Sequence, residues 1–130
     1  MLIIGHRFIQ SPNFYHIPNI EAISNTPSNS TIYIDFNEDN LEIINYAISN
    51  DLSLALGVGN ITEIIYASAL EAAFIIVPKE LARTAQEIAN NYLFDAKILV
   101  HVSDEKEIEE LAILSIDGVI FSNAIIKTNS

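Results

Sequence analysis

Two adjacent polar residues, His6 and Arg7, follow the apolar run "MLII" and Gly5 at the start of the chain. A His-Arg pair at the end of a strand raises the question of whether a site that processes phosphate lies there, since imidazole gains and loses a proton near neutral pH. A second histidine, His101, lies near the end of the apolar run 97–102 and is a residue type that serves as a general base or metal ligand. We therefore take His6, Arg7 and His101 as candidates for a functional site, with His101 as a candidate catalytic base. The alternative is that these are polar residues satisfied locally where a strand meets water.

The segment "GVGN" at 57–60 is the best candidate for binding an anion through the backbone. Two glycines allow backbone N–H groups to approach a phosphate at the start of a helix. The segment lacks a third glycine and a following Lys-Ser or Lys-Thr, so it matches neither a dinucleotide fingerprint nor a P-loop. A tight turn that caps the next helix is the structural alternative. Lys79 directly follows Pro78, and its structural interpretation is a residue that opens the next helix.

Five short apolar runs after residue 30 are expected to hold these side chains. The runs are mostly apolar on both faces, as strands buried on two sides are, and the segments between them have apolar residues at helical spacing. The pattern therefore predicts parallel strands that alternate with helices. The runs are "TIYIDF" at 31–36, "LSLALGV" at 52–58, "AFIIVP" at 73–78, "KILVHV" at 97–102 and "DGVIFS" at 117–122.

The chain also repeats itself internally, which supports this alternation. An offset of 44 residues places "SLALGVGNITEIIYASALEAAFIIVP" over "KILVHVSDEKEIEELAILSIDGVIFS" without a gap. Asn60 then aligns with Asp104 and Glu63 with Glu107, and each pair has the spacing of a helix N-cap with a returning glutamate. Half of the offset is the length of one βα unit, so the repeat is evidence for the fold and not, by itself, for a function.

The predicted fold is α/β, with repeated βα units around a parallel sheet of about five to six strands. We expect one domain over 1–130, with an irregular segment containing one strand at 1–30 and the repeated units at 31–125. A short helical turn is expected at "IEAIS", and the terminal "KTNS" is expected to fray. Right-handed crossovers leave two arrangements, an open flavodoxin-like sheet or a partial (β/α)-barrel. We favour the open sheet, and we expect a homodimer because bare strand edges promote pairing.

In either arrangement, ligands bind at the carboxyl ends of the parallel strands, where helix N-termini gather. That edge supplies the ligand-binding candidates in addition to the catalytic ones. They are Asp35, Asn37, Gly57, Gly59, Asn60, Lys79, Ser103, Ser122 and Asn123.

Composition narrows the classes of partner. The chain has 130 residues, half of them hydrophobic, no cysteine, and a net charge of −11 from 17 acidic and 6 basic residues. This charge disfavours nucleic acid and anionic membrane surfaces as partners. Without cysteine, disulfides, thiolate metal sites and a cysteine nucleophile are excluded. No apolar run approaches the roughly 18 residues of a membrane span and no leader is evident, so we expect a cytoplasmic protein.

The motif "LIIGHR" resembles the first barrel strand of glycerophosphodiester phosphodiesterases, and "VHVSDEKEIEELAILSIDGVIFS" resembles their last barrel units. The second segment is equally similar to other phosphate-binding barrels, including aldolases of the keto-deoxy-phosphogluconate type. The resemblance covers about 30 residues, and it implies catalytic roles for His6 and Arg7. Phe8 stands where the family has glycine, and Tyr33 stands where it has the first carboxylate of a metal pair, with Asp35 as the second.

Since the metal pair is incomplete, we expect no bound metal and no cofactor. The sequence therefore predicts a non-catalytic domain that binds a small phosphorylated or other anionic ligand, or a protein partner, and that self-associates. The alternative is a degenerate phosphodiesterase-like hydrolase that uses His6 and Arg7.

Overall fold

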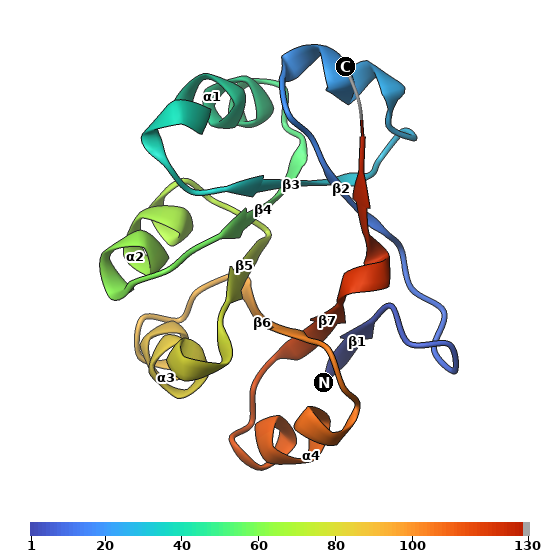
Figure 1. Cartoon of the computed structure of the whole chain (residues 1–130). Coiled ribbons are helices and arrows are strands. Elements are labelled where there is room, and N and C mark those ends of the chain that lie inside the picture. The colour runs from blue at the N-terminus through green and yellow to red at the C-terminus, as the bar shows by residue number, and fades with distance from the viewer. Residues whose placement is uncertain (129–130) are drawn as a thin grey trace.

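A computed structural model describes residues 1–128 and shows one all-parallel sheet of eight strands, strongly curled into a half-barrel (Figure 1). The strand order is β1-β7-β6-β5-β4-β3-β2-β8. The strands are β1 Leu2–Ile4, β2 Phe14–His16, β3 Thr31–Asp35, β4 Ser53–Gly57, β5 Phe74–Val77, β6 Lys97–Val102, β7 Gly118–Phe121 and β8 Ile125–Lys127.

Consecutive strands from β2 to β7 are neighbours, so the strand order never reverses. An open doubly wound sheet requires a reversal that sends helices to both faces. Here the four α-helices all lie on the convex face (Figure 1), which makes the partial barrel the correct arrangement and the favoured flavodoxin-like sheet wrong. The helices are α1 Leu41–Ser49, α2 Ile61–Ala69, α3 Ala82–Asn91 and α4 Lys106–Ile113.

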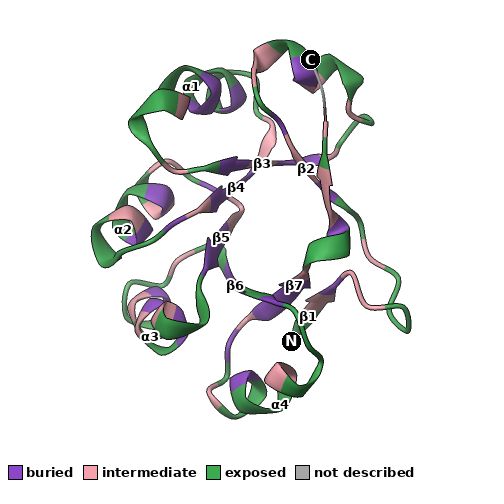
Figure 2. Cartoon of the chain, viewed as in Figure 1, coloured by how far each residue is buried: buried purple, intermediate pink, exposed green. Residues whose placement is uncertain are grey.

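The sheet buries apolar side chains on both faces, as its apolar runs predict (Figure 2). Alternate residues such as Ile75 and Ile98 pack beneath the helices in the larger core. The intervening residues, among them Phe14, Leu99 and Ile120, form a second core on the concave face. A tightly curled sheet therefore covers its own concave face, and no second layer of helices is needed there.

Asn60 caps α2 as predicted, although the Glu63 carboxylate binds Gly59 N–H and not Asn60 N–H. Glu63 N–H donates to the Asn60 side chain at 2.9 Å, and the Glu63 carboxylate accepts from Gly59 N–H at 2.8 Å. The predicted cap at Asp104 is wrong, because the Asp104 carboxylate accepts from Lys106 N–H and Glu105 is the residue before α4. At the start of α4, the Glu107 carboxylate accepts from the N–H groups of Ser103 and Asp104.

The first 30 residues contain more regular structure than the sequence indicates. A 3-10 helix spans Ile20–Asn25, as expected from "IEAIS", but β2 and the terminal β8 were not predicted, and the sheet has eight strands instead of five to six. The two terminal strands, β1 on β7 and β8 on β2, form the sheet edges.

The last residues are only partly as expected. Lys127 belongs to β8 and Thr128 N–H donates to His16 O at 3.1 Å, so the predicted fraying is wrong for both residues. The same prediction for 129–130 lies outside the described residues. Within the described chain, no helix combines the length and the apolar character that crossing a membrane requires.

Candidate functional site

The carboxyl ends of the parallel strands meet at one rim, and this rim carries both histidines proposed from the sequence. His6 follows β1 by two residues, and His101 lies within β6 opposite Ile120, which in turn pairs with Ile4 of β1. Two hollows at this rim contain the candidates. We call them the rim groove, beside the segment after β1, and the mouth, at the carboxyl end of β3, β4 and β5.

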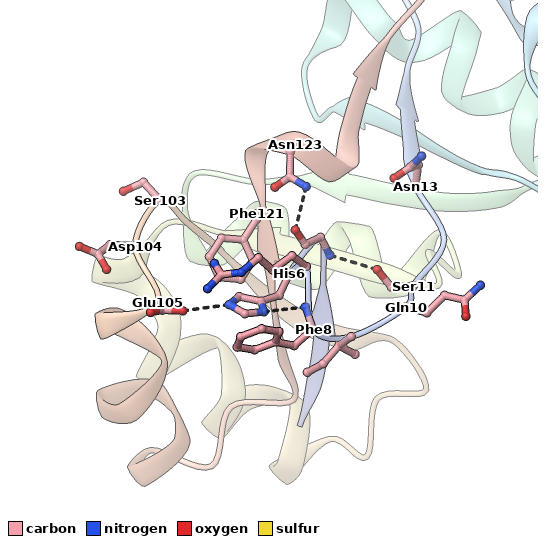
Figure 3. Close-up of a pocket in the computed structure, with 13 residues that line it drawn as sticks. His6, Phe8, Gln10, Ser11, Asn13, Ser103, Asp104, Glu105, Phe121 and Asn123 are labelled. Carbon is pink, nitrogen blue, oxygen red and sulfur yellow. Dashed lines mark hydrogen bonds and ion pairs between the residues drawn. The ribbon is translucent and has the colours of Figure 1, made fainter.

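The rim groove has a volume of about 820 Å³ and lies between the segment 5–13, the start of α4 and the end of β7 (Figure 3). Its walls are mainly polar. Besides His6 and Phe121, the groove is lined by Arg7, Gln10, Ser11, Asn13, Ser103, Asp104, Glu105 and Asn123.

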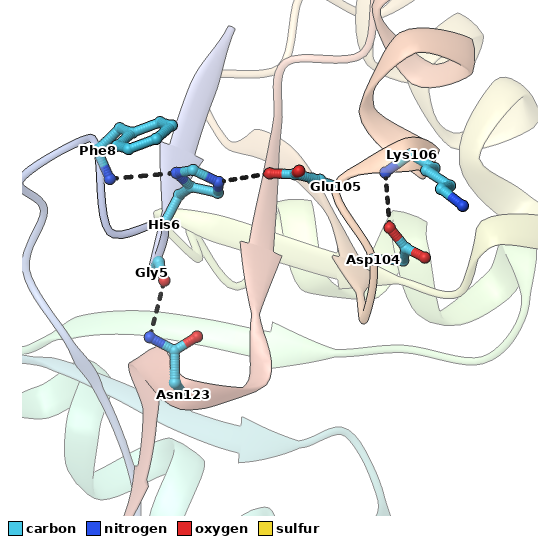
Figure 4. Close-up of polar contacts among 7 residues, drawn as sticks. All are labelled: Gly5, His6, Phe8, Asp104, Glu105, Lys106 and Asn123. Atoms are coloured by element: carbon cyan, nitrogen blue, oxygen red, sulfur yellow. Dashed lines mark hydrogen bonds and ion pairs between the residues drawn. The ribbon is translucent and has the colours of Figure 1, made fainter.

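His6 uses both ring nitrogens in contacts within the protein (Figure 4). Phe8 N–H donates to Nδ1 at 3.2 Å, so this nitrogen carries no proton. The proton is therefore on Nε2, which donates to Glu105 Oε2 at 2.9 Å. The ring also packs against Phe8 and Phe121, with centroids 5.0 and 5.6 Å away. This histidine has no free lone pair with which to accept a proton from a substrate.

Arg7 is exposed, and its guanidinium lies 4.5 Å from the centroid of the Phe8 ring. Within residues 1–128 it has no ion-pair partner. The two nearby carboxylates have other contacts, Glu105 with His6 and Asp104 with Lys106 N–H (Figure 4). Arg7 is thus the cationic group in the groove whose charge is available to a ligand, while Asp104 and Glu105 keep their negative charges.

Hydrogen bonds around Gly5 hold the groove in shape. Gly5 N–H donates to Ser11 Oγ at 3.0 Å, and Asn123 Nδ2 donates to Gly5 O at 2.7 Å (Figures 3 and 4). Gly5 has a φ of +99°, and a Cβ there would lie 2.9 Å from Ala124 Cβ. Both the backbone conformation and the packing at position 5 therefore require glycine. The contacts of Gly5 with Asn123 and Ala124 link the segment after β1 to the turn after β7.

The mouth has a volume of about 370 Å³ and contains Asp35, Gly57, Gly59 and His101 from the sequence-based set, together with Tyr33. The Tyr33 hydroxyl donates to Asp35 Oδ1 at 3.0 Å. Burial first, and then the charge of Asp35 and this hydrogen bond, raise the pKa of Tyr33 well above its usual value. A Cβ on Gly57 would lie 2.6 Å from the Tyr33 hydroxyl oxygen, so glycine leaves room for this contact.

His101 contacts Ser122 and does not contact His6. Its Nε2 lies 2.7 Å from Ser122 Oγ, and both residues are exposed. The two belong to neighbouring strand segments, because Ser122 directly follows β7 and β7 pairs with β6. The structure therefore divides the three catalytic candidates between two places, His6 and Arg7 in the groove and His101 at the mouth.

The remaining ligand-binding candidates have structural partners. Gly59 and Asn60 belong to the cap of α2, and the Glu63 carboxylate occupies the Gly59 N–H that a phosphate would need. Asn37 accepts from Asn40 N–H at 3.1 Å. Lys79 Nζ lies 3.1 Å from Glu110 Oε2, which raises the pKa of Lys79 through their hydrogen bond and charge attraction.

Sequence reasoning missed Tyr33, which lines the mouth, and His16, which contacts Tyr33 and Asp35. His16 Nε2 lies 3.8 Å from Asp35 Oδ2, and its ring meets the edge of Tyr33 with centroids 4.9 Å apart. The alternation Tyr33-Ile34-Asp35 was a usable signal for Tyr33, since it places the tyrosine on the same face as Asp35. No comparable pattern marked His16, which lies in a segment interrupted by prolines.

Across residues 1–128, no group of three or more His, Cys, Asp or Glu side chains is arranged to hold a metal ion. A scan against models of protein families gives no match to this chain, and a search of curated proteins gives none either.

Proposed function

We propose that this protein is a cytoplasmic binding domain whose rim groove takes a small anionic ligand through Arg7. The observation that carries the proposal is the position of Arg7, a guanidinium with no ion-pair partner in residues 1–128, beside Phe8 in a groove that also contains amide, hydroxyl and two carboxylate side chains. Guanidinium binds carboxylate and phosphate with two parallel hydrogen bonds, and amides such as Gln10 and Asn13 supply further donors.

The contacts of His6 support binding over phosphodiester cleavage. Hydrolysis of a phosphodiester needs a group that shuttles protons and, in the similar enzymes, a metal that polarises the phosphoryl oxygen. His6 already donates from Nε2 and accepts at Nδ1. Tyr33 replaces the carboxylate that would complete a metal pair with Asp35, and its hydroxyl binds Asp35 directly.

The charge of the molecule limits the size of the ligand. With a net charge of −11, the protein repels an extended polyanion. A small anion that is in direct contact with Arg7 gains a charge-assisted hydrogen bond, which contributes about 1.5–3 kcal/mol. The proposed ligand class is therefore a phosphate monoester or a small carboxylate.

Titration with inorganic phosphate and with acetate, followed by backbone NMR, tests this proposal. We expect saturable shifts in the amides of 7–13 and of Asn123, with phosphate the tighter of the two. The substitution Arg7→Gln should weaken binding about tenfold or more, corresponding to at least about 1.4 kcal/mol.

Arg83→Gln is the matched control, since Arg83 is an exposed arginine of α3 that lies outside the groove. The substitution removes the same charge as Arg7→Gln. Equal weakening by both substitutions would assign the effect to net charge and contradict a site at Arg7. Absence of any saturable shift in the groove amides would also contradict the proposal.

Self-association is the second part of the proposal. Large apolar side chains are exposed along the neighbouring helices α1 and α2, including Tyr46, Ile61 and Tyr66. Light scattering should give twice the mass of the chain, and Tyr66→Lys should shift the mass to that of one chain. A single-chain mass for the unmodified protein at all concentrations would contradict this part and leave the groove proposal standing.

A further inference from the structure

The pair His101 and Ser122 has the geometry of a general base and a nucleophile. The 2.7 Å between His101 Nε2 and Ser122 Oγ lies within the range for a hydrogen bond that can pass the serine proton to the ring. His101 lies on β6, where its side chain alternates with Val100 and Val102, which pack in the core beneath the helices. His101 therefore faces the concave side, on the rigid framework of the sheet.

Both side chains are open to a substrate. His101 and Ser122 are exposed, and in the described chain Ser122 is the one hydrogen-bond partner of His101. Nδ1 has no partner among residues 1–128, so it can carry the ring proton towards water, and in that tautomer the Nε2 lone pair is directed at Ser122. This is the tautomer that a general base needs.

The mouth, which His101 lines, has a definite chemical character. Ile76 and Val77 supply apolar surface, and Asp35 and Glu63 supply negative charge. Of the described residues that line the mouth, none is Lys or Arg. A neutral or cationic molecule with a short apolar group fits this surface, and an anionic one is repelled.

We propose that Ser122 is a reactive nucleophile activated by His101, and that it cleaves short neutral or cationic acyl esters at the mouth. Ser122 Oγ attacks the carbonyl carbon while its proton passes to His101 Nε2. The bond to the alcohol oxygen breaks, and the departing oxygen takes that proton. Water then attacks the acyl-serine with His101 again as the base, which releases the carboxylic acid and restores Ser122 and His101.

This activity is separate from anion binding in the rim groove and does not depend on it. The pair lacks a carboxylate behind the histidine, because Nδ1 has no partner among residues 1–128. An orienting carboxylate makes a large contribution in serine hydrolases. Turnover is therefore expected to be slow, and formation of a covalent adduct is the more sensitive measurement.

A fluorophosphonate probe tests the nucleophile, because it bonds to an activated serine with loss of fluoride. Intact-mass and peptide mass spectrometry should show one adduct, on Ser122, in the full chain. Ser122→Ala should abolish it, and His101→Gln should slow its formation about 100-fold, the order of a lost general base. Ser28→Ala is the control, since Ser28 is an exposed serine before β3, at the opposite end of the sheet, and should label like the unmodified protein.

Ester hydrolysis tests the substrate class. Neutral p-nitrophenyl benzoate should be cleaved faster than anionic mono-p-nitrophenyl terephthalate, whose carboxylate cannot reach its own ester, and Asp35→Asn should reduce this preference. Failure of the probe to label the folded protein, or equal labelling of the Ser122→Ala variant, overturns the proposal. Equal rates for the neutral and anionic esters overturn the assigned substrate class.

Discussion

At the scale of single residues, the rim depends on which side chains already have partners. His6 is engaged by Phe8 and Glu105, whereas Arg7 next to it has no ion-pair partner in the described chain. At the mouth, Tyr33 binds Asp35, and His101 binds Ser122. Neighbouring residues whose types are equally suited to binding a ligand therefore differ in whether their polar atoms are available.

Tyr33 predicts a measurable pH dependence of stability. Its pKa is raised in the folded protein by burial and by Asp35, while in the unfolded chain it ionises near its usual value of about 10. The contribution of Tyr33 to stability is therefore complete below about pH 10 and is lost as the pH rises through the higher folded pKa.

Urea denaturation from about pH 9 to about pH 11 should show the free energy of unfolding decreasing with pH, and less steeply in Tyr33→Phe. Phenylalanine keeps the ring and removes the ionisable hydroxyl, so it isolates the titration from packing. Identical slopes for the two proteins would show that Tyr33 ionises equally in both states.

At the scale of elements, a buried polar network connects α3 to β6 and to the start of β7. Gln86, with only 4% of its surface exposed, accepts from Asp117 N–H at 2.9 Å. The Asp117 carboxylate in turn accepts from Ile98 N–H of β6 at 2.9 Å. Helix α3 and the start of β7 are thus fixed to β6 by hydrogen bonds that a repeat pattern does not reveal.

Gln86→Leu should destabilise the fold. Leucine keeps the bulk of the side chain but leaves the Asp117 N–H without its acceptor, which costs about 1–3 kcal/mol when the group is buried. Chemical denaturation gives the change in free energy. Glu87→Leu on the exposed side of α3 is the control, and a similar loss in both variants would contradict a role for the network.

Gly118 allows β1 to lie against β7. A Cβ at this position would lie 2.7 Å from the backbone oxygen of Leu2 and 2.8 Å from a methyl group of Leu99. Backbone atoms cannot yield as the end of a flexible side chain can, so the strands would have to separate.

Gly118→Ala should therefore destabilise the protein by about 1–3 kcal/mol, the usual range for overpacking. Amide hydrogen exchange should accelerate in residues 2–4 more than in β4 or β5. Gly59→Ala is the comparison, since the nearest atom to its Cβ would be Glu63 Oε1 at 3.8 Å. Unchanged protection of β1 in Gly118→Ala would rule out this account.

Sequence patterns predict the long elements better than the short ones. All five predicted strands exist, as β3 to β7, because each is a long apolar run between clear helices. The strands β2 and β8 have three residues each, too few for a period to show, and β2 lies between Pro12 and Pro18.

At the scale of the whole molecule, the five apolar runs of the sequence could not distinguish an open sheet from a curled one. Both arrangements need strands that are apolar on two faces. The decision depends on what covers the concave face, and here Phe14, Ala55 and Ala124 from distant parts of the chain meet there. For the same reason, the sequence could not show which rim candidates lie in the groove and which lie at the mouth.

The arrangement predicts uneven protection across the sheet. Strands β3 to β6 are central and have four to six residues, whereas β1 and β8 are edge strands of three residues. Native-state hydrogen exchange should be slowest for the amides of β4, β5 and β6, whose free energy of opening should be close to the global free energy of unfolding. The amides of β1 and β8 should open with a lower free energy. Equal protection of edges and centre would indicate that the sheet opens only as one unit.

The pairing of β1 with β7 also has a consequence for synthesis on the ribosome. Leu2 lies opposite Gly118 and Ile4 opposite Ile120, so β1 has no sheet partner until β7 has been synthesised. At about 5–20 residues per second, β1 waits for several seconds while β3 to β6 can already assemble. Interruption of translation before β7 would therefore leave the apolar residues of β1 exposed to chaperones and proteases.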